Sequence, residues 1–308
     1  MNPVSRSQII RDLAAKAGFH LCGMSPAETL AAEAAPYREW LDRMQWGNMD
    51  YLRKNFEKRL DPRKVMPEAR TVIALLSGYE SGTQIPAGDN YIISRYARGE
   101  DYHIRIKGML DDVIRGMEEH FGKIMCRSFV DSGVLLEKAW AERCGLGWRG
   151  KNTLLINRGH GSWFFIGIIL TDLETEYDSP ETDHCGSCDR CLRACPTGAL
   201  AAPHLLDPVK CIAYQTIENE EEIPEELRGK FAGRIFGCDI CQEVCPFNRE
   251  PLVCEDPACF PSADLVLMRR ADWEGLSPET FGELFRNTPV IRTGYDLLMR
   301  NIRFVSGK

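Results

Sequence analysis

Apolar residues recur along the first 175 residues at the spacings of helices and strands. Every third or fourth position is apolar over 9–17 and over 102–121, and a glycine follows each segment, which predicts two amphipathic helices. Short apolar runs at 71–76 and 123–130 predict buried strands. This part of the chain is therefore expected to mix helices and strands around one sheet.

Two further apolar runs predict a β-hairpin. They cover 153–157 and 162–171 and flank Arg158-Gly159-His160-Gly161, a glycine-containing loop of the length that joins neighbouring strands. We expect these two strands to pair with each other.

The apolar periodicity stops over 172–184, where acidic residues and Pro180 predict a linker. Helical spacing returns after residue 250, and Ser277-Pro278-Glu279 is a typical helix start. We expect the segment 278–305 to pack back on the body. The predicted fold class is α+β, with an α/β sandwich-like domain at 1–175, a cysteine-rich domain at 176–250 and a helical tail at 251–308.

The composition is that of an ordinary globular protein with an excess of cysteine. Hydrophobic residues make up 44% and charged residues 27%, and there are thirteen cysteines. The net charge of -7 argues against the basic surface of a typical nucleic-acid binder. The longest apolar stretch, 163–170, is far shorter than the roughly 20 residues of a membrane helix, and no signal peptide is apparent. We expect a cytoplasmic protein without membrane association, whose clustered cysteines serve metal binding or catalysis.

The cysteines between 185 and 245 follow the ligand spacing of iron–sulfur clusters. The segment 185–196 matches the bacterial ferredoxin run C-x2-C-x2-C-x3-C-P, in which the fourth cysteine binds the other of two 4Fe-4S clusters. A second run, 238–246, is one cysteine short, and Cys211 is the natural supplier. The predicted ligands are Cys185, Cys188, Cys191 and Cys245 for one cluster, and Cys195, Cys211, Cys238 and Cys241 for the other.

Two zinc sites are the competing interpretation, because C-x2-C pairs also form tetrahedral zinc sites. The triple spacing and both Cys-Pro endings favour iron–sulfur clusters. The other cysteines show no ligand spacing, and we expect small buried hydrophobic residues there, with the last two close enough in sequence to be an exception. They are Cys22, Cys126, Cys144, Cys254 and Cys259.

Three motifs precede the cysteines: Ser94–His103 (SRYARGEDYH), Val130-Asp131-Ser132-Gly133 and Gly145–Asn152 (GLGWRGKN). In this order and spacing, from about Ile9 to Asn248, the chain resembles the epoxyqueuosine reductase family. The resemblance implies cobalamin bound in the N-terminal domain and two 4Fe-4S clusters in a ferredoxin-like domain. It also implies reduction of epoxyqueuosine to queuosine in a tRNA anticodon loop.

By its position in the second motif, Asp131 is implied to protonate the departing epoxide oxygen, while the clusters pass single electrons to cobalt. From the residues alone, an aspartate before Ser-Gly is usually a turn residue. A carboxylic acid must keep its proton in order to donate it. We therefore expect Asp131 to lie in a desolvated pocket that raises its pKa.

The resemblance implies further cobalamin contacts, at Arg59, Ser94, Asp131, Leu155, Ile166, Ala213, Cys238 and Asp239. The residues alone favour core packing for Leu155 and Ile166 and a surface position for Arg59. Asp101-Tyr102-His103 begins the D-x-H-x-x-G pattern of a histidine ligand to cobalt, but Ile106 replaces the glycine. We therefore expect base-off cobalamin without a protein ligand, and a structural role for His103.

Many longer family members continue into a helical-repeat domain, whereas this chain ends at Lys308. We therefore expect the catalytic core and the short tail to hold the tRNA. Basic side chains on phosphates and aromatic rings on splayed bases hold RNA loops. Candidates by composition are Arg53, Lys54, Trp148, Arg149, Lys151 and Arg292.

Three alternative functions are compatible with the cysteines: a corrinoid reductive dehalogenase of a small organohalide, an electron-transfer subunit without its own substrate, and an iron–sulfur assembly protein. The missing twin-arginine signal counts against the first, and cobalamin binding would exclude the second. We expect a monomer that receives electrons from an unidentified low-potential donor.

Overall fold

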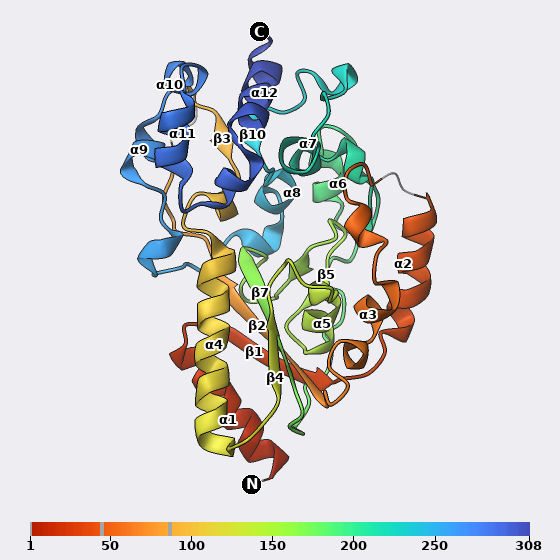
Figure 1. Ribbon diagram of the computed structural model, residues 1–308. Helices are drawn as coiled ribbons and strands as arrows, with labels where there is room; N and C mark the ends of the chain where they lie inside the picture. Colours follow the sequence, from red (N-terminus) through yellow and green to blue (C-terminus); the bar gives the residue numbers. More distant parts are fainter. Residues whose placement is uncertain (1, 44–45, 86–87) are drawn as a thin grey trace.

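The body of the molecule is built on a four-stranded antiparallel sheet in the order β1-β2-β7-β4 (Figure 1). The structure is a computed structural model that describes residues 2–43, 46–85 and 88–308. The strands are β1 (Leu21–Pro26), β2 (Thr71–Gly78), β7 (Phe164–Thr171) and β4 (Cys126–Phe129). Every residue of β2 is buried, as expected for a central strand covered on both faces.

Helices cover both faces of this sheet, because alternate side chains of a strand point to opposite sides. Ile73 and Leu75 of β2 pack with α1 (Pro3–Lys16) and α4 (Tyr102–Phe121). Val72 and Ala74 face the other way, toward a core that includes α5 (Glu137–Arg143). The helices α2 (Ala31–Arg43) and α3 (Phe56–Leu60) lie on this second side. This mixed arrangement confirms the predicted α+β class.

The predicted helices are present, with one boundary corrected. Helix α4 spans the predicted residues, begins after the N-cap Asp101 and ends at Gly122. Helix α1 starts at Pro3, earlier than its apolar pattern indicated, because Asn2 caps it by accepting a hydrogen bond from the Ser5 main-chain N–H.

The predicted strand at 71–76 is confirmed as β2, while the one at 123–130 is shorter and forms β4. The predicted hairpin is wrong. Strand β6 (Leu155–Ile156) pairs with β5 (Trp148–Arg149), whereas β7 pairs with β2 and β4. A single bridge between Asn157 and Gly161 joins the two segments. Apolar spacing identified the strands, but β7 buries far more surface in the central sheet than it would beside a two-residue partner.

The cysteine-rich region is made of short elements, and the tail is helical. The elements up to residue 243 are α6 (Arg190–Ala194), β8 (Leu200–Ala202), β9 (Leu205–Leu206), α7 (Ile212–Ile217), β10 (Arg234–Phe236) and α8 (Ile240–Glu243). The tail contains α9 (Ala263–Leu267), α10 (Arg270–Glu274), α11 (Pro278–Phe285) and α12 (Tyr295–Ser306). Within the described residues, no helix has the length and apolar character needed to cross a bilayer.

The tail shares a core with a segment from early in the chain. Strand β3 (Ile92–Ile93) pairs in parallel with β10, and Tyr91 and Ile93 pack with Trp273 and Phe285 of the tail helices. Helix α12 is tied to the cysteine-rich region by Asn301, whose buried side-chain amide donates to the carbonyls of Thr216 and Ile235. The first motif, which begins at Ser94, therefore lies outside the four-stranded sheet and beside the cysteine-rich region.

Gly161 is a place where the body lies close against the cysteine-rich region. Its φ is +71°, and a Cβ there would lie 2.1 Å from Oδ1 of Asn248. This amide oxygen cannot move away easily, because it accepts a hydrogen bond of 2.7 Å from the Ser162 main-chain N–H.

We predict that Gly161→Ala lowers the free energy of unfolding by about 2–4 kcal/mol, since it combines backbone strain with a collision at a fixed atom. Gly82→Ala is the matched control, because Gly82 has a φ of +72° but nothing within 4 Å of its Cβ position. The control should lose only about 1 kcal/mol. Denaturant unfolding of the two variants at equal cluster loading measures both, and equal losses would contradict the predicted collision.

Candidate functional site

The first predicted group of cysteines lines one pocket. Cys185, Cys188, Cys191 and Cys245 surround a cavity of about 150 Å³ together with side chains of the β5–β6 hairpin. Burial raises the pKa of Cys245, and the nearby thiols of Cys185 and Cys188 raise it further. The structure therefore brings together four cysteines that are 60 residues apart in the sequence at their extremes.

The second group also comes together. Burial raises the pKa of Cys211, and the neighbouring thiol of Cys195 adds to this rise. Burial raises the pKa of Cys241 in the same way, with further contributions from Cys238 and Cys211. These thiols are therefore near enough to influence one another's pKa, and Cys191 of the first group acts on Cys241 as well.

The third motif holds the loop of the first cysteine group. The indole N–H of Trp148 donates to Sγ of Cys185 at 3.4 Å, and the ring packs edge-on against His184 and Phe247. The ammonium of Lys151 donates to the carbonyls of Gly186, at 2.6 Å, and Cys188, at 2.9 Å. Trp148 is only 1% exposed, so the prediction that it stacks on a tRNA base is wrong.

The remaining cysteines take different roles. Cys254 and Cys259, which their closeness in sequence had set apart from the other three, form a disulfide. Cys144 is buried as predicted, and Cys22 and Cys126 are partly buried. Among the described residues, no three His, Cys, Asp or Glu side chains are gathered tightly enough to hold a single metal ion.

Asp131 lies in the loop after β4 and has a φ of +49°, an uncommon conformation for a residue with a side chain. Its Oδ2 accepts a hydrogen bond of 2.5 Å from the Tyr102 hydroxyl and lies 3.2 Å from Nε2 of His103. Its main-chain N–H donates to Oε1 of Glu137 at 2.5 Å. Three polar contacts from α4 and α5 thus fix this loop, and a bond of 2.8 Å to Asp101 orients His103.

The expected raised pKa of Asp131 is wrong. Burial raises the pKa of Asp131, but hydrogen bonds to His103 and Tyr102 outweigh it and leave the pKa below the usual value. The side chain also keeps 52% of its surface exposed, so it is only partly desolvated. The neighbouring carboxyl shows the opposite behaviour, because burial raises the pKa of Glu137 to about 8 and the charge of Asp131 adds to the rise.

Lys138 follows Glu137 on α5, and its side chain is exposed to solvent. The surrounding protein lowers its pKa, while the charges of Asp131, Glu137 and Cys241 act to raise it. Lys138 therefore adds a cation near the Asp131 loop.

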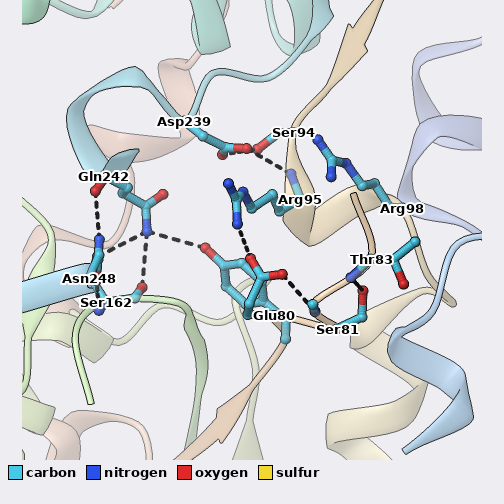
Figure 2. A network of polar contacts seen from close by, with 12 residues as sticks. Glu80, Ser81, Thr83, Ser94, Arg95, Arg98, Ser162, Asp239, Gln242 and Asn248 are labelled. Carbon is cyan, nitrogen blue, oxygen red and sulfur yellow. Dashed lines mark hydrogen bonds and ion pairs between the residues drawn. The ribbon is translucent and has the colours of Figure 1, made fainter. Parts of the chain in front are cut away.

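Ser94 and Asp239 are brought into direct contact, since the Ser94 hydroxyl donates to the Asp239 carboxylate. The main-chain N–H of Arg95 donates to the same carboxylate at 2.8 Å. Asp239 is only 3% exposed, and burial raises its pKa. The side chain of Arg95 pairs with Glu80 and lies over the ring of Trp163, as Figure 2 shows for the charged pair.

A second part of the same network joins the body to α8. The side-chain amide of Gln242 donates to the carbonyl of Ser162 at 3.0 Å, and that of Asn248 donates to the Gln242 carbonyl at 2.8 Å (Figure 2). Gln242 also reaches the hydroxyl of Tyr79 at 3.3 Å. The second run of cysteines is thereby joined to Ser162, just before β7.

The other predicted cobalamin contacts are placed less uniformly. Arg59 is 7% exposed and donates to the carbonyls of Tyr51 and Val134, so it is not a surface arginine. Leu155 is 3% exposed within the core of the body, while Ile166 is only partly buried at its edge. Ala213 is partly buried in α7, directly after Cys211 and Ile212.

Sequence reasoning missed Tyr102, Glu137 and Lys138 as site residues. Tyr102 belongs to the first motif, so its presence there was a usable signal. Glu137 and Lys138 follow Asp131 by only six and seven residues, but no motif or spacing in that segment marked them as site residues. The tail contributes Arg292, which is 60% exposed, pairs with Glu218 at 3.1 Å and lowers the pKa of Asp131 through its charge.

Two family models match this chain. One is described as epoxyqueuosine reductase QueG, DUF1730, and covers residues 59–132, and the other is a 4Fe-4S double cluster binding domain over residues 184–248. An epoxyqueuosine reductase of Cyclobacterium marinum is 41% identical over 98% of this chain and 97% of its own length. That of Cellulophaga algicola is 43% identical over 97% of each. The chain belongs to the epoxyqueuosine reductase family.

Solved structures of epoxyqueuosine reductases agree with this assignment. One that contains an epoxyqueuosine-modified tRNA-Tyr stem loop has a TM-score of 0.89 and 28% identity over 98% of this chain and 81% of that one. Another, from Bacillus subtilis, has a TM-score of 0.89 and 26% identity over the same shares, and its catalytic aspartate loop is swung out of the active site. The double cluster binding domain of the family establishes the ferredoxin-like region as a 4Fe-4S protein module.

We predict that Glu137→Gln changes how stability depends on pH. Glu137 keeps its proton up to about pH 8 in the folded protein but loses it near its ordinary pKa of 4.5 when unfolded. Between these values the folded state binds more protons, so this group's contribution to stability decreases as the pH rises, by up to about 1.4 kcal/mol per pH unit.

The difference in unfolding free energy between wild type and Glu137→Gln, measured by denaturant unfolding at several pH values, should therefore fall from pH 4.5 to 8 and be level above that range. A difference that does not vary with pH would show that Glu137 titrates normally.

Proposed function

We propose that this protein catalyses the reduction of epoxyqueuosine to queuosine in the anticodon loop of tRNA, as an oxidoreductase that removes the epoxide oxygen. The observation that carries the proposal is 41–43% identity to epoxyqueuosine reductases along 97–98% of the chain. That span contains the Asp131 loop and both cysteine groups. The solved family structure with a modified tRNA stem loop supports the same substrate.

We infer that the two cysteine groups hold two 4Fe-4S clusters with the ligands predicted from spacing. We also infer that cobalamin binds in a recess of the surface beside Asp131. The pocket lined by Cys185, Cys188, Cys191 and Cys245 supports the first ligand set. When bound, the clusters supply single electrons and cobalamin supplies a low-valent cobalt that acts as the reductant.

Several residues would hold cobalamin around this recess. The exposed side chains of Asp131 and Lys138 fit the requirement for a large cofactor beside the second cysteine group. The Ser94 hydroxyl donates a hydrogen bond to the carboxylate of Asp239, the residue directly after Cys238. The full set proposed for this role is Arg59, Ser94, Asp131, Leu155, Ile166, Ala213, Cys238 and Asp239.

Asp131 passes to the departing oxygen a proton that it first accepts from His103, because its own carboxyl is ionised at neutral pH. His103 contacts Asp131, and its pKa is raised by the hydrogen bond to Asp131, with a further rise from Asp101. The protonated form of His103 is thereby favoured at the position where the proton is needed. Tyr102 keeps the carboxylate oriented, because its hydroxyl donates a hydrogen bond to Oδ2.

The tRNA would be held by exposed basic side chains near the recess, since phosphate contacts supply most of the affinity for nucleic acid. Arg53, Lys54 and Arg149 are exposed, and Arg292 adds a cation beside Asp131. Lys151 instead contacts the first cysteine group. We further propose a monomer that acts in the cytoplasm, where its tRNA substrate is found, with electrons from an external low-potential donor.

In the proposed ligand sets each run of cysteines gives its last cysteine to the other cluster, so that the runs are crossed. This leads to a prediction about paired cysteine variants. Cys185→Ala with Cys245→Ala should remove one cluster and leave the other, because both residues serve the same cluster. Cys185→Ala with Cys195→Ala should remove both, although these two cysteines lie in the same sequence run. Iron and sulfide analysis with EPR of the reduced proteins checks this, and a retained cluster in the second variant would show that the runs are not crossed.

Asp131→Asn should lower kcat for epoxyqueuosine reduction by about 10²–10⁴ while cobalamin still binds, since it removes the proton donor but keeps the shape of the side chain. The assay uses the anaerobically reconstituted protein, a low-potential reductant and an epoxyqueuosine-bearing stem loop, with loss of one oxygen followed by mass spectrometry. Asp111→Asn on the exposed surface of α4 is the control and should react normally. Normal turnover by Asp131→Asn would refute its role as donor.

A further inference from the structure

The β5–β6 hairpin forms one wall of the pocket that contains the first cysteine group. Its loop is a tight turn, because the Gly150 N–H donates to the Leu154 carbonyl and the Thr153 N–H to the Gly150 carbonyl, both at 2.8 Å. Lys151, Asn152 and Ile156 line the pocket opposite the cysteines. The hairpin therefore presents fixed side chains to whatever the four cysteines hold.

Asn152 has a buried donor without an acceptor. The residue is 4% exposed, and its Oδ1 accepts a hydrogen bond of 3.3 Å from the Leu154 N–H, which orients the amide. Its Nδ2 has no hydrogen-bond partner among the residues that the structure describes. A buried amide N–H left unpaired is unfavourable, so an acceptor in the adjoining pocket is expected.

Trp148 provides a second donor from the same hairpin. Its indole N–H donates to Sγ of Cys185 at 3.4 Å, and packing against His184 and Phe247 fixes the ring. The ammonium of Lys151 lies beside the same cysteine loop through its bonds to Gly186 and Cys188. One short hairpin thus places two N–H donors and one positive charge at a single group of cysteines.

We propose that Trp148 and Asn152 raise the reduction potential of the cluster bound by Cys185, Cys188, Cys191 and Cys245, through N–H···S hydrogen bonds from the indole to Cys185 and from the side-chain amide to a cluster or thiolate sulfur. This inference rests on the proposed ligand set. The cluster gains one electron from the external low-potential donor, and the added negative charge resides largely on iron and sulfur. Donors aimed at sulfur stabilise the reduced form more than the oxidised form, and the potential rises.

The test is a redox titration of the anaerobically reconstituted full chain, followed by EPR of each reduced cluster. Asn152→Leu removes the donor without adding charge, and Asn152→Asp removes it while keeping the oxygen that accepts from Leu154. Trp148→Phe removes the indole N–H and keeps an aromatic ring. Each variant should lower the equilibrium constant for reduction of one cluster by threefold to tenfold, tenfold being 59 mV for one electron.

The second cluster is the internal control, and its potential should not change. Unchanged potentials of both clusters in Asn152→Leu and Trp148→Phe would overturn the inference, as would a shift confined to Asn152→Asp, which would be an effect of charge alone. Should the Asn152 variants bind no first cluster, the shift in Trp148→Phe decides.

These outcomes are distinct from failure of the proposed function. A wild-type protein with two clusters that leaves epoxyqueuosine unchanged would refute the substrate, while the potentials of the variants would still report on the hairpin.

Discussion

The geometry of the whole site depends on the hydrogen bonds made to the buried carboxylate of Asp239. Asp239 lies directly after a proposed cluster ligand, Cys238, and only 3% of it is exposed. A carboxylate in such a place needs hydrogen-bond donors, and they come from Ser94 and Arg95, more than 140 residues earlier in the chain. The cysteine-rich region can satisfy this group only when it is docked on the first motif, so the second cysteine group is held in one position relative to the body.

The same constraint reaches the central sheet. Arg95 pairs with the buried Glu80, just after β2, and lies over Trp163, just before β7. Buried charges are tolerated when each has a partner. Here the partners of Arg95 are Glu80 and Trp163, which lie next to the ends of the two central strands. An unbroken series of polar contacts therefore connects the sheet to Cys238, and the Gln242 and Asn248 amides add a second connection (Figure 2).

The environment divides the acid–base roles between two neighbouring carboxyls. Asp131 is partly exposed and receives two hydrogen bonds, which favour its ionised form, whereas Glu137 is more enclosed by protein beside that negative charge and keeps its proton at neutral pH. The expectation that the donor itself would be desolvated came from chemistry alone and did not consider Tyr102 and His103. Their positions at the start of α4, opposite the loop after β4, follow from packing of α4 on the sheet.

Local patterns determined much of this protein from sequence alone. Apolar periodicity and capping residues located α4, and an apolar run located β2. Cysteine spacing predicted both ligand groups, because spacing in sequence controls which thiols can reach one cluster. The partner of β7, the contact of Ser94 with Asp239, the burial of Trp148 against Cys185 and the disulfide between Cys254 and Cys259 were decided only by the tertiary structure. Each of these features depends on which side chains come into contact in the folded chain. The free energy that favours these contacts comes from burial and hydrogen bonding, and the local sequence around one residue does not indicate which residue it will contact.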